Sequence, residues 1–193
     1  MAGAGAGRGE GRRVPEPLLI VDVQNGLLND FTKHVPARIV RLIEGGDWAP
    51  LLFTRFVNTE DSPYQRFLDW HGCAEPPETE LVAELAPFVE RGRVFTKHGR
   101  TGLPGEAHDY LRQHGFERIT VVGIDTDMCV LKSAMDIFDL GIQPIVLADC
   151  CASTLGAYAH LAGLAILSRN IGPPQLRDAE MGDAMGRAPG GRR

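Results

Sequence analysis

Short apolar runs alternate with segments of helical periodicity along most of the chain. The runs are four to six residues long and rich in β-branched side chains, which favours buried strands. They predict strands at residues 18–21, 51–54, 93–96, 119–122 and 144–149. Between them, apolar positions recur at helical spacing and predict helices at 35–43, 79–88, 107–113, 126–140 and 153–167. This alternation predicts an α/β fold, with a mainly parallel sheet covered by helices on both faces.

The fourth predicted strand leads directly into a helix that carries a cysteine. The strand ends at Gly123, and Cys129 lies in the first turn of the helix that follows. Thr126 or Asp127 can cap this helix by accepting a hydrogen bond from a backbone N–H group. Unpaired N–H groups and the helix dipole favour a thiolate at such a position, which makes Cys129 a candidate nucleophile.

Two more reactive side chains follow predicted strands. Asp22 ends the first strand and Lys97 follows the third. Because the carboxyl ends of parallel strands meet at one edge of a sheet, we expect both side chains to lie near Cys129. Lys97 would lower the pKa of the thiol, Asp22 would take its proton, and the N–H groups of Asp125 and Cys129 would hold an oxyanion. Taken singly, each residue has a structural explanation, but the combination favours a thioester mechanism.

A long connection over residues 55–77 is expected to form one wall of a substrate pocket. Arg55 could bind a substrate carboxylate or make a structural salt bridge. Trp70 could stack on a flat substrate, but core packing or an oligomer interface is the more ordinary role for such a side chain. His98 could line the pocket or lie on the surface, and Gln24 is a further candidate for substrate binding.

Composition limits the possible partners and the compartment. The 193 residues carry a net charge of −5, which argues against nucleic acid as the main partner, and no apolar run is long enough to span a membrane. The cysteines are few and unevenly spaced, which favours free thiols in a reducing cytoplasm and gives no zinc-binding pattern. We predict one domain over residues 14–172, a disordered tail at 1–13 without a secretory signal, and a flexible tail at 173–193.

The motifs resemble the isochorismatase-like cysteine hydrolase family over about residues 18–167. The resemblance is carried by the run that ends in Asp22-Val23-Gln24, by Lys97 after its strand, and above all by the stretch from Gly123 to Cys129. It implies a three-layer α-β-α sandwich with a doubly wound, Rossmann-like sheet. It further implies a catalytic triad of Asp22, Lys97 and Cys129, a cis peptide between Ile124 and Asp125, and assembly into a homo-oligomer.

One departure from the family pattern bears on metal binding. Nicotinamidase members carry an Asp-x-His metal motif after the second strand, whereas residues 54–58 read Thr-Arg-Phe-Val-Asn. We therefore expect no metal and no other cofactor. Asp125 is also more acidic than the resemblance leads one to expect beside an oxyanion hole.

The leading hypothesis from the sequence is a cysteine hydrolase of a small amide or other C–N bond. Asp22 would be the base and acid, and Lys97 would stabilise the thiolate of Cys129. Two alternatives remain: a hydrolase of an isochorismate-type vinyl ether, and a thiol redox or binding protein on the same fold. The retained Asp22 and Lys97 argue against the last, because binding alone would not need a base.

Overall fold

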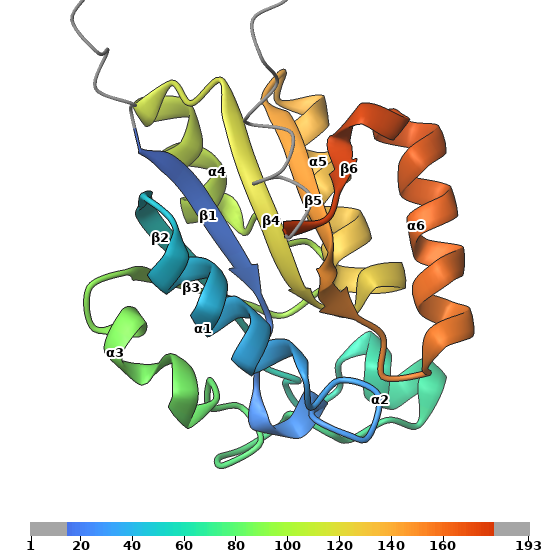
Figure 1. Ribbon diagram of the computed structural model, residues 1–193. Helices are drawn as coiled ribbons and strands as arrows, with labels where there is room; N and C mark the ends of the chain where they lie inside the picture. The colour runs from blue at the N-terminus through green and yellow to red at the C-terminus, as the bar shows by residue number, and fades with distance from the viewer. Residues whose placement is uncertain (1–14, 180–193) are drawn as a thin grey trace, which may run out of the picture.

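A single parallel sheet organises the computed structural model, which describes residues 15–179 (Figure 1). Within these residues the strand order is β3-β2-β1-β4-β5-β6, and every pair of neighbouring strands is parallel. The strands are β1 Glu16–Val21, β2 Trp48–Phe56, β3 Arg93–Lys97, β4 Arg118–Ile124, β5 Gln143–Ala152 and β6 Leu176–Arg177. The order reverses direction between β1 and β4, so the sheet is doubly wound, and the predicted α/β fold class is confirmed.

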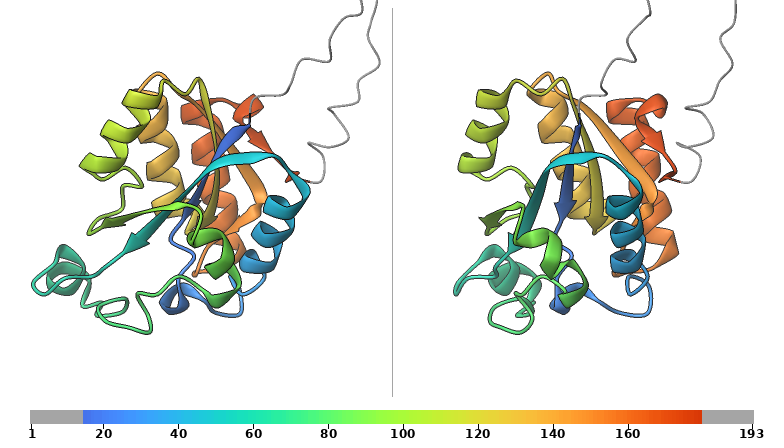
Figure 2. Two further views of the ribbon diagram at one scale, coloured as in Figure 1. Left: turned by 90° about the vertical axis from the view of Figure 1, so that its left-hand side faces the viewer. Right: turned by 60° about the vertical axis from the view of Figure 1, so that its left-hand side comes forward.

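Helices cover both faces of the sheet, as the alternation of elements required. They are α1 Val35–Gly45, α2 Pro63–Leu68, α3 Ala86–Val89, α4 Gly105–His114, α5 Leu131–Asp139 and α6 Ala157–Ile171. Figure 2 shows α4 and α5 on one face and α1 on the other, while α6 packs against α5 and β5. No helix among residues 15–179 combines the length and the apolar character needed to cross a membrane.

The two central strands form the middle of the core. Residues 18–21 of β1 and 119–124 of β4 are all buried, because helices cover both faces of these strands. Gly123 has a φ of 130°, and a Cβ atom there would lie 2.1 Å from the carbonyl oxygen of Val21. Glycine therefore allows β1 and β4 to approach closely, and this brings the carboxyl ends of the two strands together.

Three predicted helices differ from the structure. The helix predicted at 79–88 is reduced to a 3₁₀ turn at Ala83–Leu85 and the short α3, because Leu81 pairs with Gln24 as an isolated bridge. The helix predicted at 126–140 begins as a π-helical turn over Thr126–Val130 before α5. The last helix begins at Ala157 rather than at residue 153, since β5 continues to Ala152.

The carboxyl-terminal boundary of the fold also differs from the prediction. A 3₁₀ turn at Pro173–Gln175 leads into β6, whose residues pair with Val146 and Leu147 of β5. The sheet therefore extends past residue 172, where the flexible tail was predicted to begin. The tail predicted at 1–13 and the remainder of the tail predicted at 173–193, from residue 180 onward, lie outside the described residues.

Candidate active site

Asp22 lies directly after β1 and is completely buried. Its backbone has a φ of 50°, a left-handed conformation, and its N–H group donates to Oγ1 of Thr54 at 3.2 Å. The Thr54 hydroxyl in turn donates to Oδ1 of Asp22 at 2.7 Å. Thr54 is held in place by β2, in which it pairs with Val21. Two hydrogen bonds to one neighbouring side chain thus fix the orientation of the buried carboxylate, a role for Thr54 that the sequence pattern does not reveal.

Lys97 ends β3 and is 2% exposed. Its Nζ atom lies 2.6 Å from Oδ2 of Asp22 and donates to the carbonyl oxygens of Gly99 at 3.1 Å and Arg100 at 3.4 Å. Burial, the largest single influence, lowers the pKa of Lys97, but the charges of Asp22 and Cys129 and hydrogen bonds to both outweigh it. The net pKa is raised, so Lys97 remains a cation at neutral pH.

Cys129 completes the cluster from the π-helical turn after β4. As a residue it is partly exposed, unlike the buried Cys73, Cys150 and Cys151. Asp22 and Lys97 lie close enough to the thiol to act on its pKa, Asp22 raising it and Lys97 lowering it. The structure therefore brings together the three side chains that the sequence placed at separate strand ends.

The protonation state of Cys129 differs from the expectation. The sequence predicted a pKa lowered by the helix start and by Lys97. In the structure the pKa is raised, first by burial and then by the negative charge of Asp22, and Lys97 offsets this only in part. Cys129 is thus a neutral thiol at rest, and the Asp22 carboxylate beside it is the group that can accept its proton.

Asp125 lies in the connection between β4 and Cys129. The peptide bond between Ile124 and Asp125 is cis. Both carboxylate oxygens of Asp125 accept hydrogen bonds from Thr154, from its backbone N–H at 2.6 Å and from its hydroxyl at 3.0 Å. Burial raises the pKa of Asp125 to about 6, although the bonds from Thr154 lower it in part. The acidic side chain is therefore engaged by the connection between β5 and α6.

Two further contacts hold the same turn against α6 and the connection before it. The hydroxyl of Thr126 is hydrogen-bonded to Nδ1 of His160 at 2.8 Å, and the Ser153 hydroxyl donates to the carboxylate of Asp127. Gly163 of α6 packs so closely that a Cβ atom there would lie 2.8 Å from the Cα atom of Asp127. We call residues 125–127 with these partners the turn clasp. No sequence motif reveals the clasp, since its partners are ordinary polar residues far along the chain.

Gln24 and Arg55 have partners within the protein rather than in a pocket. Gln24 is completely buried: its Oε1 atom accepts from the N–H of Phe56 at 2.7 Å, and its Nε2 atom donates to the carbonyls of Phe56 and Thr79 at 2.8 and 3.0 Å. Arg55 is exposed and donates to Oγ1 of Thr96 at 3.0 Å. These contacts engage both polar atoms of the buried Gln24 side chain within the protein. The exposed Arg55 makes this one side-chain hydrogen bond, and its role in binding a substrate carboxylate stays a prediction.

Trp70 belongs to an aromatic group with Phe56 and Tyr64. The rings of Phe56 and Trp70 are stacked with centroids 6.0 Å apart, and Tyr64 meets both edge-on. Nζ of Lys97 lies 5.9 Å from the centroid of Phe56, so this group adjoins the cluster of Asp22, Lys97 and Cys129. His98 lies at the surface, with Nδ1 3.0 Å from the carbonyl oxygen of Val57. The sequence analysis named Trp70 as a candidate but missed Tyr64.

The position of the family's metal motif is filled by a structural amide. Asn58 is 2% exposed, donates to the carbonyls of Trp70 and Gly72, and accepts from the hydroxyl of Ser62. Its side chain is thus fully engaged in holding the connection after β2. Within residues 15–179, no group of three or more His, Cys, Asp or Glu side chains is arranged to hold a metal ion. The residues present do not fit the metal site of nicotinamidases.

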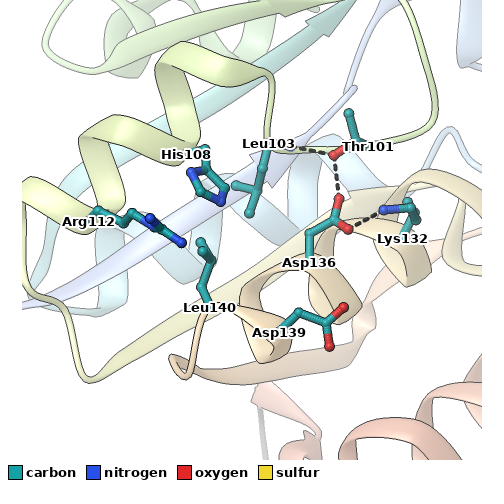
Figure 3. Close-up of a pocket in the computed structure, with 8 residues that line it drawn as sticks. All are labelled: Thr101, Leu103, His108, Arg112, Lys132, Asp136, Asp139 and Leu140. Atoms are coloured by element: carbon teal, nitrogen blue, oxygen red, sulfur yellow. Dashed lines mark hydrogen bonds and ion pairs between the residues drawn. The ribbon is translucent and has the colours of Figure 1, made fainter.

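Two surface hollows lie away from this cluster. One, of about 390 Å³, lies between α4 and α5, where Thr101 and Lys132 both bond to Asp136 (Figure 3). The other, of about 470 Å³, lies near the amino ends of β1 and β4 beside α1. Neither is lined by Asp22, Lys97 or Cys129.

The fold and the cluster define the class of protein. A doubly wound parallel sheet with reactive side chains at its carboxyl edge is typical of α/β enzymes. The particular family follows from comparison: the Isochorismatase domain matches residues 16–177, and the chain belongs to this family of hydrolases.

Two similar proteins of known name are nicotinamidases. That of Acinetobacter baylyi (strain ATCC 33305 / BD413 / ADP1) is 38% identical over 70 residues, which cover 36% of this chain and 29% of that protein. That of Escherichia coli (strain K12) is 26% identical over 178 residues, which cover 71% of this chain and 83% of that protein. The match to the first thus spans less than a third of its length.

Solved structures share the fold at low identity. An isochorismatase-like hydrolase from Alkaliphilus metalliredigens has a TM-score of 0.76 at 18% identity, covering 90% of this chain and 100% of that one. N-carbamoylsarcosine amidase from Thermoplasma acidophilum has a TM-score of 0.73 at 21% identity, covering 86% and 98%. Nicotinamidase/pyrazinamidase from Bacillus subtilis has a TM-score of 0.72 at 21% identity, covering 86% and 100%.

Proposed function

We propose that this protein hydrolyses a small amide or related C–N bond through a thioester on Cys129. The observation that carries the proposal is the buried contact of 2.6 Å between Lys97 and Asp22, both of which interact with the thiol of Cys129. A buried ion pair is costly to maintain, and here it adjoins the one partly exposed cysteine among the described residues. The nicotinamidase relatives support an amide as the bond that is cleaved.

The neutral thiol assigns the first proton transfer to Asp22. As Sγ of Cys129 attacks the carbonyl carbon, the thiol proton passes to the Asp22 carboxylate, and the oxyanion forms beside the N–H groups of Asp125 and Cys129. The C–N bond then breaks while Asp22 gives its proton to the leaving nitrogen, which leaves a thioester. Water attacks the thioester with Asp22 again as base, which releases the acid and restores the thiol.

In this mechanism Lys97 stabilises charge rather than transferring a proton. Its raised pKa keeps the ammonium group charged throughout the cycle. The cation offsets the negative charge that moves from Asp22 to sulfur and then to the carbonyl oxygen. Since the site residues do not fit a metal, no step is assigned to one.

A panel of small amides that includes nicotinamide and N-carbamoyl amino acids tests the proposal. We expect ammonia release by the native protein and a loss of at least about 10³-fold in the Cys129→Ala variant. Cys150→Ala, which removes a buried thiol away from the cluster, is the matched control and should keep its activity. Equal turnover of an isochorismate-type vinyl ether by native protein and the Cys129→Ala variant, without amide cleavage, would contradict the proposal.

A further inference from the structure

Arg100 lies in the connection between β3 and α4, three residues after Lys97. Its carbonyl oxygen accepts a hydrogen bond from Nζ of Lys97, which ties this backbone to the proposed active site. Its exposed guanidinium group lies over the ring of Tyr64, with the guanidinium carbon 5.0 Å from the ring centroid. An arginine stacked on a ring keeps its N–H groups available at the edge, where they can bind a planar anion.

Tyr64 connects Arg100 to the cluster of Asp22, Lys97 and Cys129. The pKa of Tyr64 is raised, first by burial and then by the charge of Cys129, while Arg100 lowers it. Lys97 and Asp22 act on the same hydroxyl, with opposite signs. The ring centroid of Tyr64 lies 4.9 Å from that of Phe56, and Nζ of Lys97 lies 5.9 Å from the Phe56 centroid. Arg100 therefore lies against the aromatic group that adjoins the cluster.

Arg100 differs from Lys97 in its ion pairing within the described part of the chain. Lys97 is neutralised by Asp22 at 2.6 Å, whereas none of the ion pairs found within residues 15–179 includes Arg100. An arginine that is oriented by an aromatic ring, anchored at its backbone and unpaired with the described carboxylates is suited to a carboxylate supplied by a ligand.

We propose that Arg100, held over Tyr64, binds a carboxylate group of the substrate. The inference rests on the proposed function and narrows it: the favoured substrates are small amides that carry a carboxylate close to the bond that is cleaved. Arg100 is then a specificity-determining residue, because neutral amides would gain nothing from its guanidinium fork.

Alkylation of Cys129 tests this proposal without knowledge of the substrate. Iodoacetate and iodoacetamide both form a C–S bond to the thiol and release iodide while the thiol proton is lost, but only iodoacetate carries a carboxylate. We expect the iodoacetate-to-iodoacetamide rate ratio at Cys129, measured by peptide mass spectrometry, to fall about fivefold in Arg100→Gln. Arg100→Lys, which keeps the charge, should retain much of the native ratio.

A matched control separates a local effect from general surface charge. Arg66 is also exposed and lies over an aromatic ring, with its guanidinium carbon 5.1 Å from the centroid of Phe67, so Arg66→Gln should leave the ratio unchanged. An unchanged ratio in Arg100→Gln, or an equal fall in Arg66→Gln, would overturn the role of Arg100. Failure of Cys129 to react with either reagent would instead overturn the proposed nucleophile.

The amide panel supplies the second measurement. Between two amides that differ only in a carboxylate, Arg100→Gln should raise KM for the charged one about tenfold and leave the neutral one unchanged. An equal change in both would contradict carboxylate binding, even if Cys129 remained essential for turnover.

Discussion

The opposite charges of Asp22 and Lys97 compensate each other inside the protein core. Their side chains are 0% and 1% exposed, and burying either charge alone would cost several kcal/mol. Thr54 and the carbonyls of Gly99 and Arg100 provide the remaining hydrogen bonds. Such an arrangement is poorly explained by stability alone, since apolar residues of similar size would pack at least as well.

Removal of one partner should therefore leave the other as a buried charge without compensation. We expect Lys97→Met to lower the free energy of unfolding by about 3–5 kcal/mol and the double variant with Asp22→Asn to lose less than the sum of the single changes. Lys33→Met breaks an ion pair with Asp30 whose side chains are 67% and 88% exposed, and should cost at most about 0.5 kcal/mol. Urea unfolding measures the free energy of unfolding of Lys97→Met, Asp22→Asn, the double variant and Lys33→Met. A loss in the double variant that equals the sum of the two single losses would contradict the buried pairing.

Asp125 gives a prediction for the pH dependence of stability. Because burial raises its pKa to about 6, the protonated form is favoured in the folded protein, and this stabilisation is full below about pH 4 and lost as the pH rises through 6. Asp125→Asn cannot titrate. The stability of the native protein relative to this variant should thus fall by about 2–3 kcal/mol between pH 4 and pH 7. Urea unfolding at several pH values measures the difference in unfolding free energy between the two proteins. A difference that does not vary with pH would contradict the prediction.

At the scale of elements, helix α6 packs against the turn that carries Cys129. Gly163 faces the backbone of Thr126 and Asp127, and the turn clasp adds hydrogen bonds from Ser153, Thr154 and His160. Helix α6 therefore packs against the backbone of the turn. The connection before α6 forms hydrogen bonds to the side chains of residues 125 and 127.

Adding a methyl group at Gly163 should disturb this support. Gly163→Ala would place Cβ 2.8 Å from Asp127, so we expect a loss of about 1–3 kcal/mol in unfolding free energy and slower alkylation of Cys129. Gly105→Ala in α4, where nothing lies within 4 Å of the added atom, is the control and should be neutral or slightly stabilising. Thermal unfolding and iodoacetamide labelling provide the readouts. Equal behaviour of the two variants would show that α6 does not position the turn.

The elements also show how far the sequence could predict the fold. β1 and β4 were predictable because continuous apolar runs are typical of buried parallel strands. β6 was missed because a strand of two residues carries no periodicity. The helix expected at 79–88 was wrong because the buried Gln24 side chain donates a hydrogen bond to the carbonyl oxygen of Thr79. Tertiary contacts thus decided the segments whose local pattern was weak.

The clustering of Asp22, Lys97 and Cys129 was predictable, but its surroundings were not. Each of the three residues lies at or after the end of a strand, and parallel strands end together at one edge of a sheet. Thr54, Tyr64 and Thr154 could not be identified, since no local spacing links them to the nucleophile. The raised pKa of Cys129 was also missed, because it depends on burial that only the folded chain reveals.

At the scale of the whole molecule, strand order brings the reactive groups together. β1 lies between β2 and β4, so Asp22 is next to the turn that follows β4, while Lys97 reaches across from β3 on the far side of β2. The side chains come from positions 22, 97 and 129, far apart in the chain. The site therefore exists only in the folded sheet, and local unfolding of any of these strands would abolish it.

The thioester is the central claim, and trapping it is the most direct test. The native protein mixed with a cleaved amide should be quenched in acid within one turnover and digested for peptide mass spectrometry. The account predicts the mass of the acyl group on the peptide that contains Cys129, and its absence in Cys129→Ala. Amide cleavage that continues at the native rate in Cys129→Ala, or an acyl group found on another residue, would contradict the account.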